Sequence, residues 1–145
     1  MRVMVIVKAT QQSEAGILPS TQLFEDMGRF NQELINAGIM LAGEGLHPSS
    51  RGTRVHFNGD QRTVENGPFA LDNLMCGYWI WRVKSLQEAI DWAKKAPNPH
   101  PGANTHLEIR QIFEAEDFAE SFRPELREQE ARMRTQVEQL ASATN

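Results

Sequence analysis

The sequence has a single cysteine, no long apolar run and no excess of basic residues. Cys76 has no second cysteine with which to form an internal disulfide, and this fits a reducing cytosol. The apolar run at residues 3–7 is too short for a signal peptide, and no segment approaches the roughly 20 apolar residues of a membrane span. We therefore expect a cytoplasmic protein without a membrane segment.

The distribution of charge excludes one class of partner. The formal net charge is −4, and residues 1–113 hold 11 acidic and 11 basic side chains. Residues 114–145 carry the whole imbalance, with 8 acidic and 4 basic side chains. No basic stripe is present to neutralise phosphates, so we expect no nucleic-acid partner.

Several motifs that bind cofactors or metals are also missing. Gly43 and Gly45 are not followed by the helix that a dinucleotide fingerprint requires. Ser49 and its neighbour lie in a polar loop, which we interpret as a connector rather than a nucleophile turn. No pair of histidines has the spacing of a zinc motif, and His100 lies in a stiff, proline-rich loop that we expect at the surface. We therefore expect neither a metal nor a cofactor.

The sequence does contain short strand patterns and two amphipathic helix patterns. A helix is predicted to begin at Ser20 or Thr21 and to stop at Gly38, and a Ser85–Glu88 capping box opens a second one. Asn58-Gly59 tolerates positive φ and predicts a hairpin. The second helix has one apolar face, formed by Leu86, Ala89, Ile90 and Ala93. The predicted strands are 2–8, 39–46, 53–57, 62–65, 75–83 and 106–113.

This order of elements predicts an α+β fold. Without the hairpin it is the split βαβ arrangement of ferredoxin-like folds, with both helices on one face of an antiparallel sheet. We expect a domain over residues 1–113 and a charged helical extension over 114–145, with Pro124 near a helix start. The extension either remains solvated or packs across a partner copy.

The strand over 77–83 carries large apolar side chains on both faces. Tyr78 and Ile80 alternate with Trp79 and Trp81, yet the two helices can cover only one face. A large exposed apolar face usually marks an interface, so we expect a homodimer in which a second copy covers the sheet.

Glu44 and His47 are candidates for acid–base chemistry. An imidazole near a carboxylate at a strand end can transfer protons near neutral pH, provided that Gly45 introduces a bulge. Each residue also has a structural interpretation. Glu44 can form a salt bridge with Arg54 or Arg82, and His47 can simply hydrogen-bond to the backbone.

The segment Glu65-Asn66-Gly67-Pro68-Phe69-Ala70 resembles the signature of the YCII-related family, also called the DGPF domain. The family's usual wording is Asp-Gly-Pro-Phe-Ala-Glu. The resemblance also covers residues 42–48, 85–96 and 108–110, and it implies a dimeric α+β barrel. Members are sometimes found beside sigma factors, which implies a possible link to transcriptional regulation.

The chain departs from the family pattern at several positions. Asn66 stands where the family commonly has Asp, and residues 71–74 replace a charged Glu-Thr-Lys-Glu segment. Some relatives use a histidine in the first helix with an aspartate before a proline. Here residues 20–37 contain no histidine and Ala96 precedes the proline, so that pair cannot be carried over.

These observations predict a site in a cleft at the strand ends. Glu44 and His47 are its candidate catalytic residues, and Trp79 and Trp81 are either pocket walls or core. The other candidate ligand-binding residues are Asn66, Gly67, Pro68, Phe69 and Asp72. We expect a homodimeric module that binds a small molecule or regulates a partner. The alternative is a cofactor-free lyase or isomerase that uses Glu44 and His47 as acid and base.

Overall fold

The structure, a computed structural model, describes residues 1–144 apart from the side chain of Ala119. The chain divides into two compact units, Met1–Ile112 and Phe113–Asn145. The first contains β1 (Arg2–Lys8), α1 (Gln11–Glu14), α2 (Thr21–Asn36), β2 (Met40–Gly45), the 3-10 turn η1 (Ser49–Arg51), β3 (Thr53–Asn58), β4 (Gln61–Asn66), β5 (Met75–Arg82), α3 (Leu86–Lys95) and β6 (Leu107–Gln111). The second contains the 3-10 segment η2 (Ala115–Ser121) and α4 (Pro124–Ala143).

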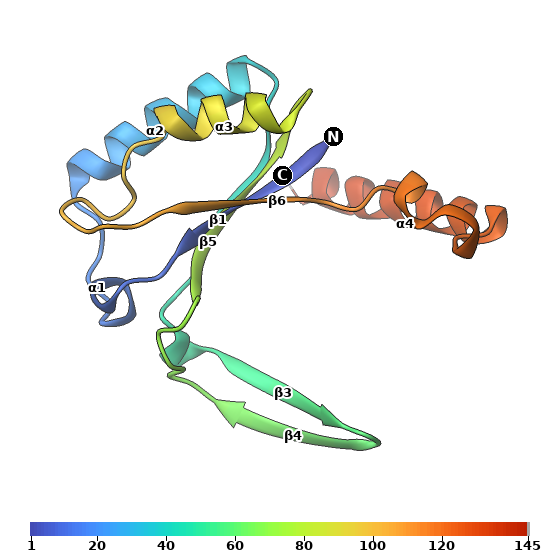
Figure 1. Ribbon diagram of the computed structural model, residues 1–145, viewed down its shortest axis with the longest axis horizontal. Helices are drawn as coiled ribbons and strands as arrows, with labels where there is room; N and C mark the ends of the chain where they lie inside the picture. The colour runs from blue at the N-terminus through green and yellow to red at the C-terminus, as the bar shows by residue number, and fades with distance from the viewer. Residues whose placement is uncertain (145) are drawn as a thin grey trace. The chain divides into compact units, whose positions relative to one another are not determined.

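The first unit is built on a four-stranded antiparallel sheet in the order β2-β5-β1-β6 (Figure 1). The predicted α+β class is confirmed. The strands of the described chain do not close into a barrel, because β3 and β4 form a separate two-stranded sheet. In Figure 1 both long helices of this unit, α2 and α3, lie on the same face of the four-stranded sheet.

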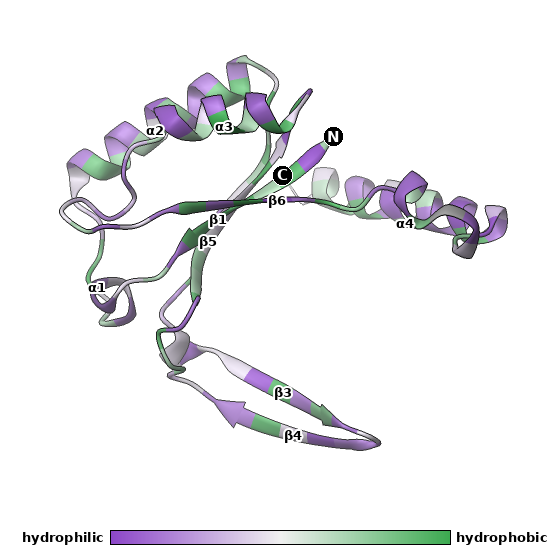
Figure 2. Ribbon diagram, in the orientation of Figure 1, coloured by the Kyte–Doolittle hydropathy of each residue, from purple (hydrophilic) through white to green (hydrophobic). Residues whose placement is uncertain are grey.

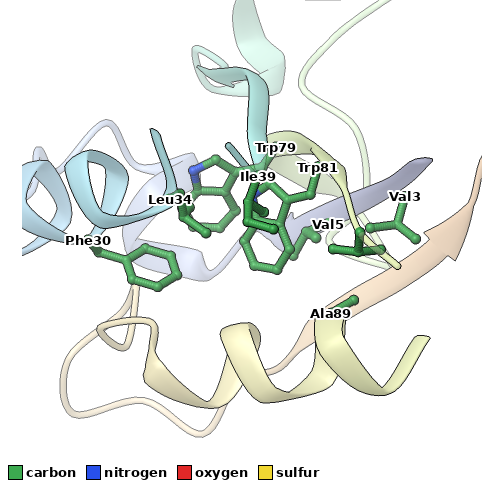
Figure 3. Close-up of a cluster of buried hydrophobic side chains, with 9 residues drawn as sticks. Val3, Val5, Phe30, Leu34, Ile39, Trp79, Trp81 and Ala89 are labelled. Carbon is green, nitrogen blue, oxygen red and sulfur yellow. The ribbon is translucent and has the colours of Figure 1, made fainter. Parts of the chain in front are cut away.

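That face carries the hydrophobic core. Trp79 and Trp81 of β5 lie between the sheet and the helices, where Phe30 of α2 meets both indole rings edge-on (Figure 3). Trp81 is completely buried, and Leu34 and Ala89 pack in the same cluster. Each large apolar side chain buried in this way stabilises the fold by about 1.5–3 kcal/mol.

Local sequence signals fix both ends of α2. The Ser20 side chain accepts a hydrogen bond from the Leu23 backbone N–H at 3.2 Å, which satisfies a donor that has no partner within the helix. At the other end Gly38 adopts a φ of 71°, a conformation that favours glycine. The predicted helix and both of its end signals are confirmed.

The prediction for α3 needs two corrections. Ser85 caps the helix by accepting from the Glu88 N–H, but the Glu88 carboxylate accepts from the Lys84 N–H rather than from Ser85. Leu86 is not part of the buried face and remains exposed. Trp92 takes its place against the core, because the large indole reaches the sheet from the middle of the helix, while Leu86 lies at its first position.

The β3–β4 hairpin was predicted correctly, including its turn. Gly59 has a φ of 59°, and the register pairs Val55 with Val64. Apolar and polar residues alternate along β3, whereas β4 is polar except for Val64 (Figure 2). On the polar face the His56 ring lies 2.7 Å from the Glu65 carboxylate, so these two side chains form a surface pair.

The second unit combines the 3-10 segment η2 with the long helix α4. Pro124 occupies the first turn of α4, where its missing N–H costs nothing. The Phe118 ring contacts the rings of both Phe113 and Phe122, with centroid separations of 4.9 and 5.7 Å. No side chain of α4 is buried among the residues that the structure describes.

Candidate functional site

The first unit has an open cavity of about 780 Å³ at one end of its sheet. Five stretches of chain form the wall, namely the end of β1, the segment from α1 into α2, the end of β2 with the residues after it, the start of β5 and the loop between α3 and β6. Apolar side chains make up much of it, and they include Val7, Ile17, Leu18, Leu23, Phe24, Met27 and Leu46.

Glycines on the edge strand make room for this cavity. Gly43 pairs with Trp79 across the β2–β5 ladder, and a β-carbon on Gly43 would lie 2.9 Å from the Trp79 ring. Gly43 therefore has to be small because the Trp79 side chain approaches it closely, and the expected bulge at Gly45 was wrong, since the register shift of β2 lies between Met40 and Ala42. Gly45 has open space where a side chain would stand, so its small size keeps this part of the wall clear.

Trp79 lies on the wall of the cavity as well as in the core. Its indole Nε1 donates to the Asn31 side-chain oxygen at 2.9 Å, and Asn31 also lines the cavity. This bond fixes the orientation of the carboxamide and satisfies the indole donor. Trp81, its neighbour on the same face, is not on the cavity wall and belongs to the core alone.

A cysteine and a histidine meet in the wall although they are far apart in the sequence. The Cys76 thiol donates to the Lys8 carbonyl at 3.4 Å, and His100 Nε2 lies 2.7 Å from the same oxygen. The Cys76 sulfur is 3.8 Å from that ring nitrogen. Burial raises the pKa of the Cys76 thiol, so the group stays protonated at neutral pH.

The expectation that His100 lies at the surface is only partly met, because the loop folds back and half-buries its ring. No local pattern in this proline-rich loop pointed to Lys8, which lies on the first strand. Partners so distant in the sequence are fixed by sheet topology alone.

Glu44 and His47 both contribute to the cavity wall, but they do not form a pair. Alternation places Glu44, opposite Tyr78, on the other pleat face from Gly43 and Trp79. The His47 ring instead contacts Arg51, whose guanidinium nitrogen lies 3.1 Å from Nε2. In the described chain no ion pair joins Glu44 to Arg54 or Arg82 either, and both Glu44 and His47 are exposed.

The loop that carries Asn66-Gly67-Pro68-Phe69 is not part of the cavity wall. A β-carbon on Gly67 would overlap the Ser49 carbonyl oxygen, so this position needs glycine because two backbones approach closely. A left-handed backbone is not the reason, because Gly67 has no positive φ. Asn66 accepts a hydrogen bond from the Thr53 hydroxyl at 3.1 Å, which ties the loop to β3.

Ser49 connects this loop to α1 and is more than a connector residue. Its hydroxyl accepts from the Phe69 N–H at 2.9 Å and donates to the Glu14 carboxylate, while its own N–H donates to Glu14 at 2.9 Å. Ser49 is only 8% exposed, so these bonds satisfy a buried polar group. Sequence reasoning missed this role, because Glu14 and Phe69 lie 35 and 20 residues away.

The remaining candidate residues lie outside the cavity. The Phe69 ring is covered by the Arg54 guanidinium at 3.8 Å, a cation–π contact that holds the loop against β3. Asp72 is exposed and accepts a hydrogen bond from Asn73, a residue with a φ of 52°. The structure thus brings Glu44, His47 and Trp79 to one cavity, and it places the turn around Pro68 apart from them.

A comparison with protein families agrees with the signature in this turn. A model of the YCII-related domain matches residues 1–116. The chain belongs to the YCII-related domain family. No curated protein matches the chain, so the function of this YCII-related protein has to be argued from its own structure.

The described residues offer neither a metal cluster nor a membrane-spanning helix. Within residues 1–144, no three His, Cys, Asp or Glu side chains come together in a way that could hold a metal ion. None of the helices in the described part of this YCII-related chain has the length and apolar character needed to cross a bilayer.

Proposed function

We propose that this YCII-related protein binds a small organic molecule in the cavity at the end of its sheet. The observation that carries the proposal is the cavity itself, because about 780 Å³ lies within the range of typical small-molecule sites. Its wall combines apolar side chains with a few polar groups held at fixed orientations, such as Asn31 and His100. This combination is typical of binding sites.

Binding without chemistry fits the cavity better than acid–base catalysis does. A protonated thiol is a weak nucleophile, and burial keeps Cys76 in that form. His100 Nε2 bonds to a carbonyl rather than activating the thiol, and His47 contacts Arg51 rather than a carboxylate. We therefore propose that Glu44 and His47 line the ligand site and do not act as acid and base.

The proposal also covers the topology of the fold, the domain bounds and the oligomeric state. The strand order β2-β5-β1-β6 supports a ferredoxin-like split βαβ arrangement with the β3–β4 hairpin inserted. The domain would cover residues 1–113, with 114–145 as an extension. On the sheet face opposite the helices, Met4 pairs with Ile80 and Ile6 with Tyr78, forming an apolar strip across two central strands. A second copy that covers this face would complete a dimeric α+β barrel.

The purified protein is accordingly expected to be a dimer at micromolar concentration. Light scattering coupled to size-exclusion chromatography measures the mass directly. A substitution of Ile80 by Asp should shift the population to monomer, because a carboxylate in an apolar interface has no partner. A monomer mass for the wild-type protein across the micromolar range would contradict the assembly proposed here.

Filling the cavity should abolish binding. Gly45 lines it, and a β-carbon at this position would have no other atom within 4 Å, so Gly45→Trp adds an indole to the wall without a clash at its β-carbon. We expect the variant to lose at least about tenfold in affinity for a fluorescent apolar probe, which corresponds to about 1.4 kcal/mol. Fluorescence titration of N-phenylnaphthylamine measures the affinity.

Gly28→Trp is the matched control for this substitution. Gly28 also has open space around its β-carbon position, but it lies on α2 outside the cavity wall. The control should bind the probe as the wild type does. Equal binding by Gly45→Trp and the wild type would show that the probe binds elsewhere, and the proposed site would be wrong.

A further inference from the structure

We infer that the ligand of this cavity is electrically neutral and mostly apolar, an inference that rests on the binding function proposed above. Three independent features of the wall carry it. They are the charges that line the cavity, the hydrogen bonds already made by its polar atoms, and the apolar side chains left exposed at its border.

The wall holds no permanent positive charge that could pair with an anionic ligand. Among the described residues that line the cavity there is no lysine or arginine, and Glu44 is the one carboxylate. Arg51 contacts His47 but does not line the cavity. Arg51 and Glu44 are both exposed, so water solvates their two opposite charges. Burying a charged group without a partner is costly, and an anion such as a phosphate ester or carboxylate would incur that cost here.

The polar atoms of the wall are largely engaged within the protein. The Asn31 oxygen accepts from Trp79, and Cys76 and His100 both bond to the Lys8 carbonyl. The Ser13 hydroxyl is held by Thr10, with contacts of 2.8 and 3.0 Å. A strongly polar ligand would exchange its hydrogen bonds with water for few new ones, whereas an apolar ligand loses none.

Apolar side chains at the border of the cavity are left exposed to solvent. Leu18 is 81% exposed, and Ile17 and Phe24 are each more than 60% exposed, although all three line the cavity. Leu46 completes this border from the end of β2. Such a concentration of exposed apolar groups usually marks a binding site, and an apolar ligand would cover it.

Two probes that share the same aromatic rings test the inference. N-phenylnaphthylamine is neutral, and anilinonaphthalene sulfonate carries one negative charge. We expect the wild-type protein to bind the neutral probe at least about tenfold more tightly, because the sulfonate finds no cation in the wall. Leu46→Lys places an ammonium group in that wall and should reduce or reverse this preference by about tenfold.

Leu86→Lys is the matched control, because Leu86 is an exposed leucine on α3 that does not line the cavity. It should retain the wild-type preference. The inference is overturned if the wild type binds the anionic probe equally or more tightly, or if Leu46→Lys leaves the ratio unchanged. Either result, with binding still lost in Gly45→Trp, would leave the cavity as a binding site. Failure of both probes to bind would overturn the proposed function and the inference together.

Discussion

Replacing Gly67 with alanine is expected to lower the free energy of unfolding by at least about 3 kcal/mol, a large effect for a single methyl group. The reason is steric. The new β-carbon would overlap the Ser49 carbonyl oxygen, which is backbone and cannot rotate away. The loop would have to move, and the bonds from Ser49 to Phe69 and Glu14 would be strained or lost. Urea denaturation followed by circular dichroism measures the change.

Gly28→Ala provides the control for the loss of a glycine. A β-carbon at Gly28 meets no other atom, and alanine is the better helix former within α2. It should therefore raise the free energy of unfolding by roughly 0.5–1 kcal/mol. All variants should be compared at one protein concentration, since assembly shifts apparent stability. If Gly67→Ala is as stable as the wild type, the close approach to Ser49 does not exist in solution.

Trp81→Ala is expected to cost about 3–5 kcal/mol, the range for removing a fully buried aromatic side chain. Trp81 has no exposed surface and packs against Phe30 in the centre of the core. The same urea denaturation measures the loss, and Leu86→Ala on the exposed end of α3 should stay within about 0.5 kcal/mol of the wild type.

Trp81→Phe separates the packing of this side chain from its polar atom. Within the described chain the Trp81 Nε1 is buried without a hydrogen-bond partner. The desolvation of this N–H therefore already lowers the free energy of unfolding of the native protein. Phenylalanine keeps most of the ring contacts and removes that donor, and we expect a loss below about 2 kcal/mol. A loss from Trp81→Phe equal to that from Trp81→Ala would mean that the N–H is bonded after all.

The elements of this fold could be predicted because their signals are local. Ser20 and Gly38 mark the ends of α2 within a few residues, and Asn58-Gly59 determines its hairpin without help from the rest of the chain. The side-chain alternation in β5 also placed Trp79 and Trp81 together on one face, and the structure shows that this is the face that packs in the core. Each of these patterns acts over one turn or one strand.

The cavity could not be predicted in the same way, because its wall comes from five separate stretches of chain. The sheet topology brings Cys76 close to His100 and Glu14 close to Ser49, although each pair is far apart in the sequence. One local signal was available but is easily overlooked. Ile17 and Leu18 are apolar residues in a loop that a folded chain would normally make polar, and they lie at the border of the cavity.

The most direct test of the proposed function is a crystal structure of the protein grown with N-phenylnaphthylamine. We predict electron density for the probe inside the cavity, in contact with Leu23, Phe24 and Leu46, and displaced from it in Gly45→Trp crystals. Density for the probe only at another surface, such as the apolar face of the β3–β4 hairpin, would contradict the assignment of this cavity as the binding site.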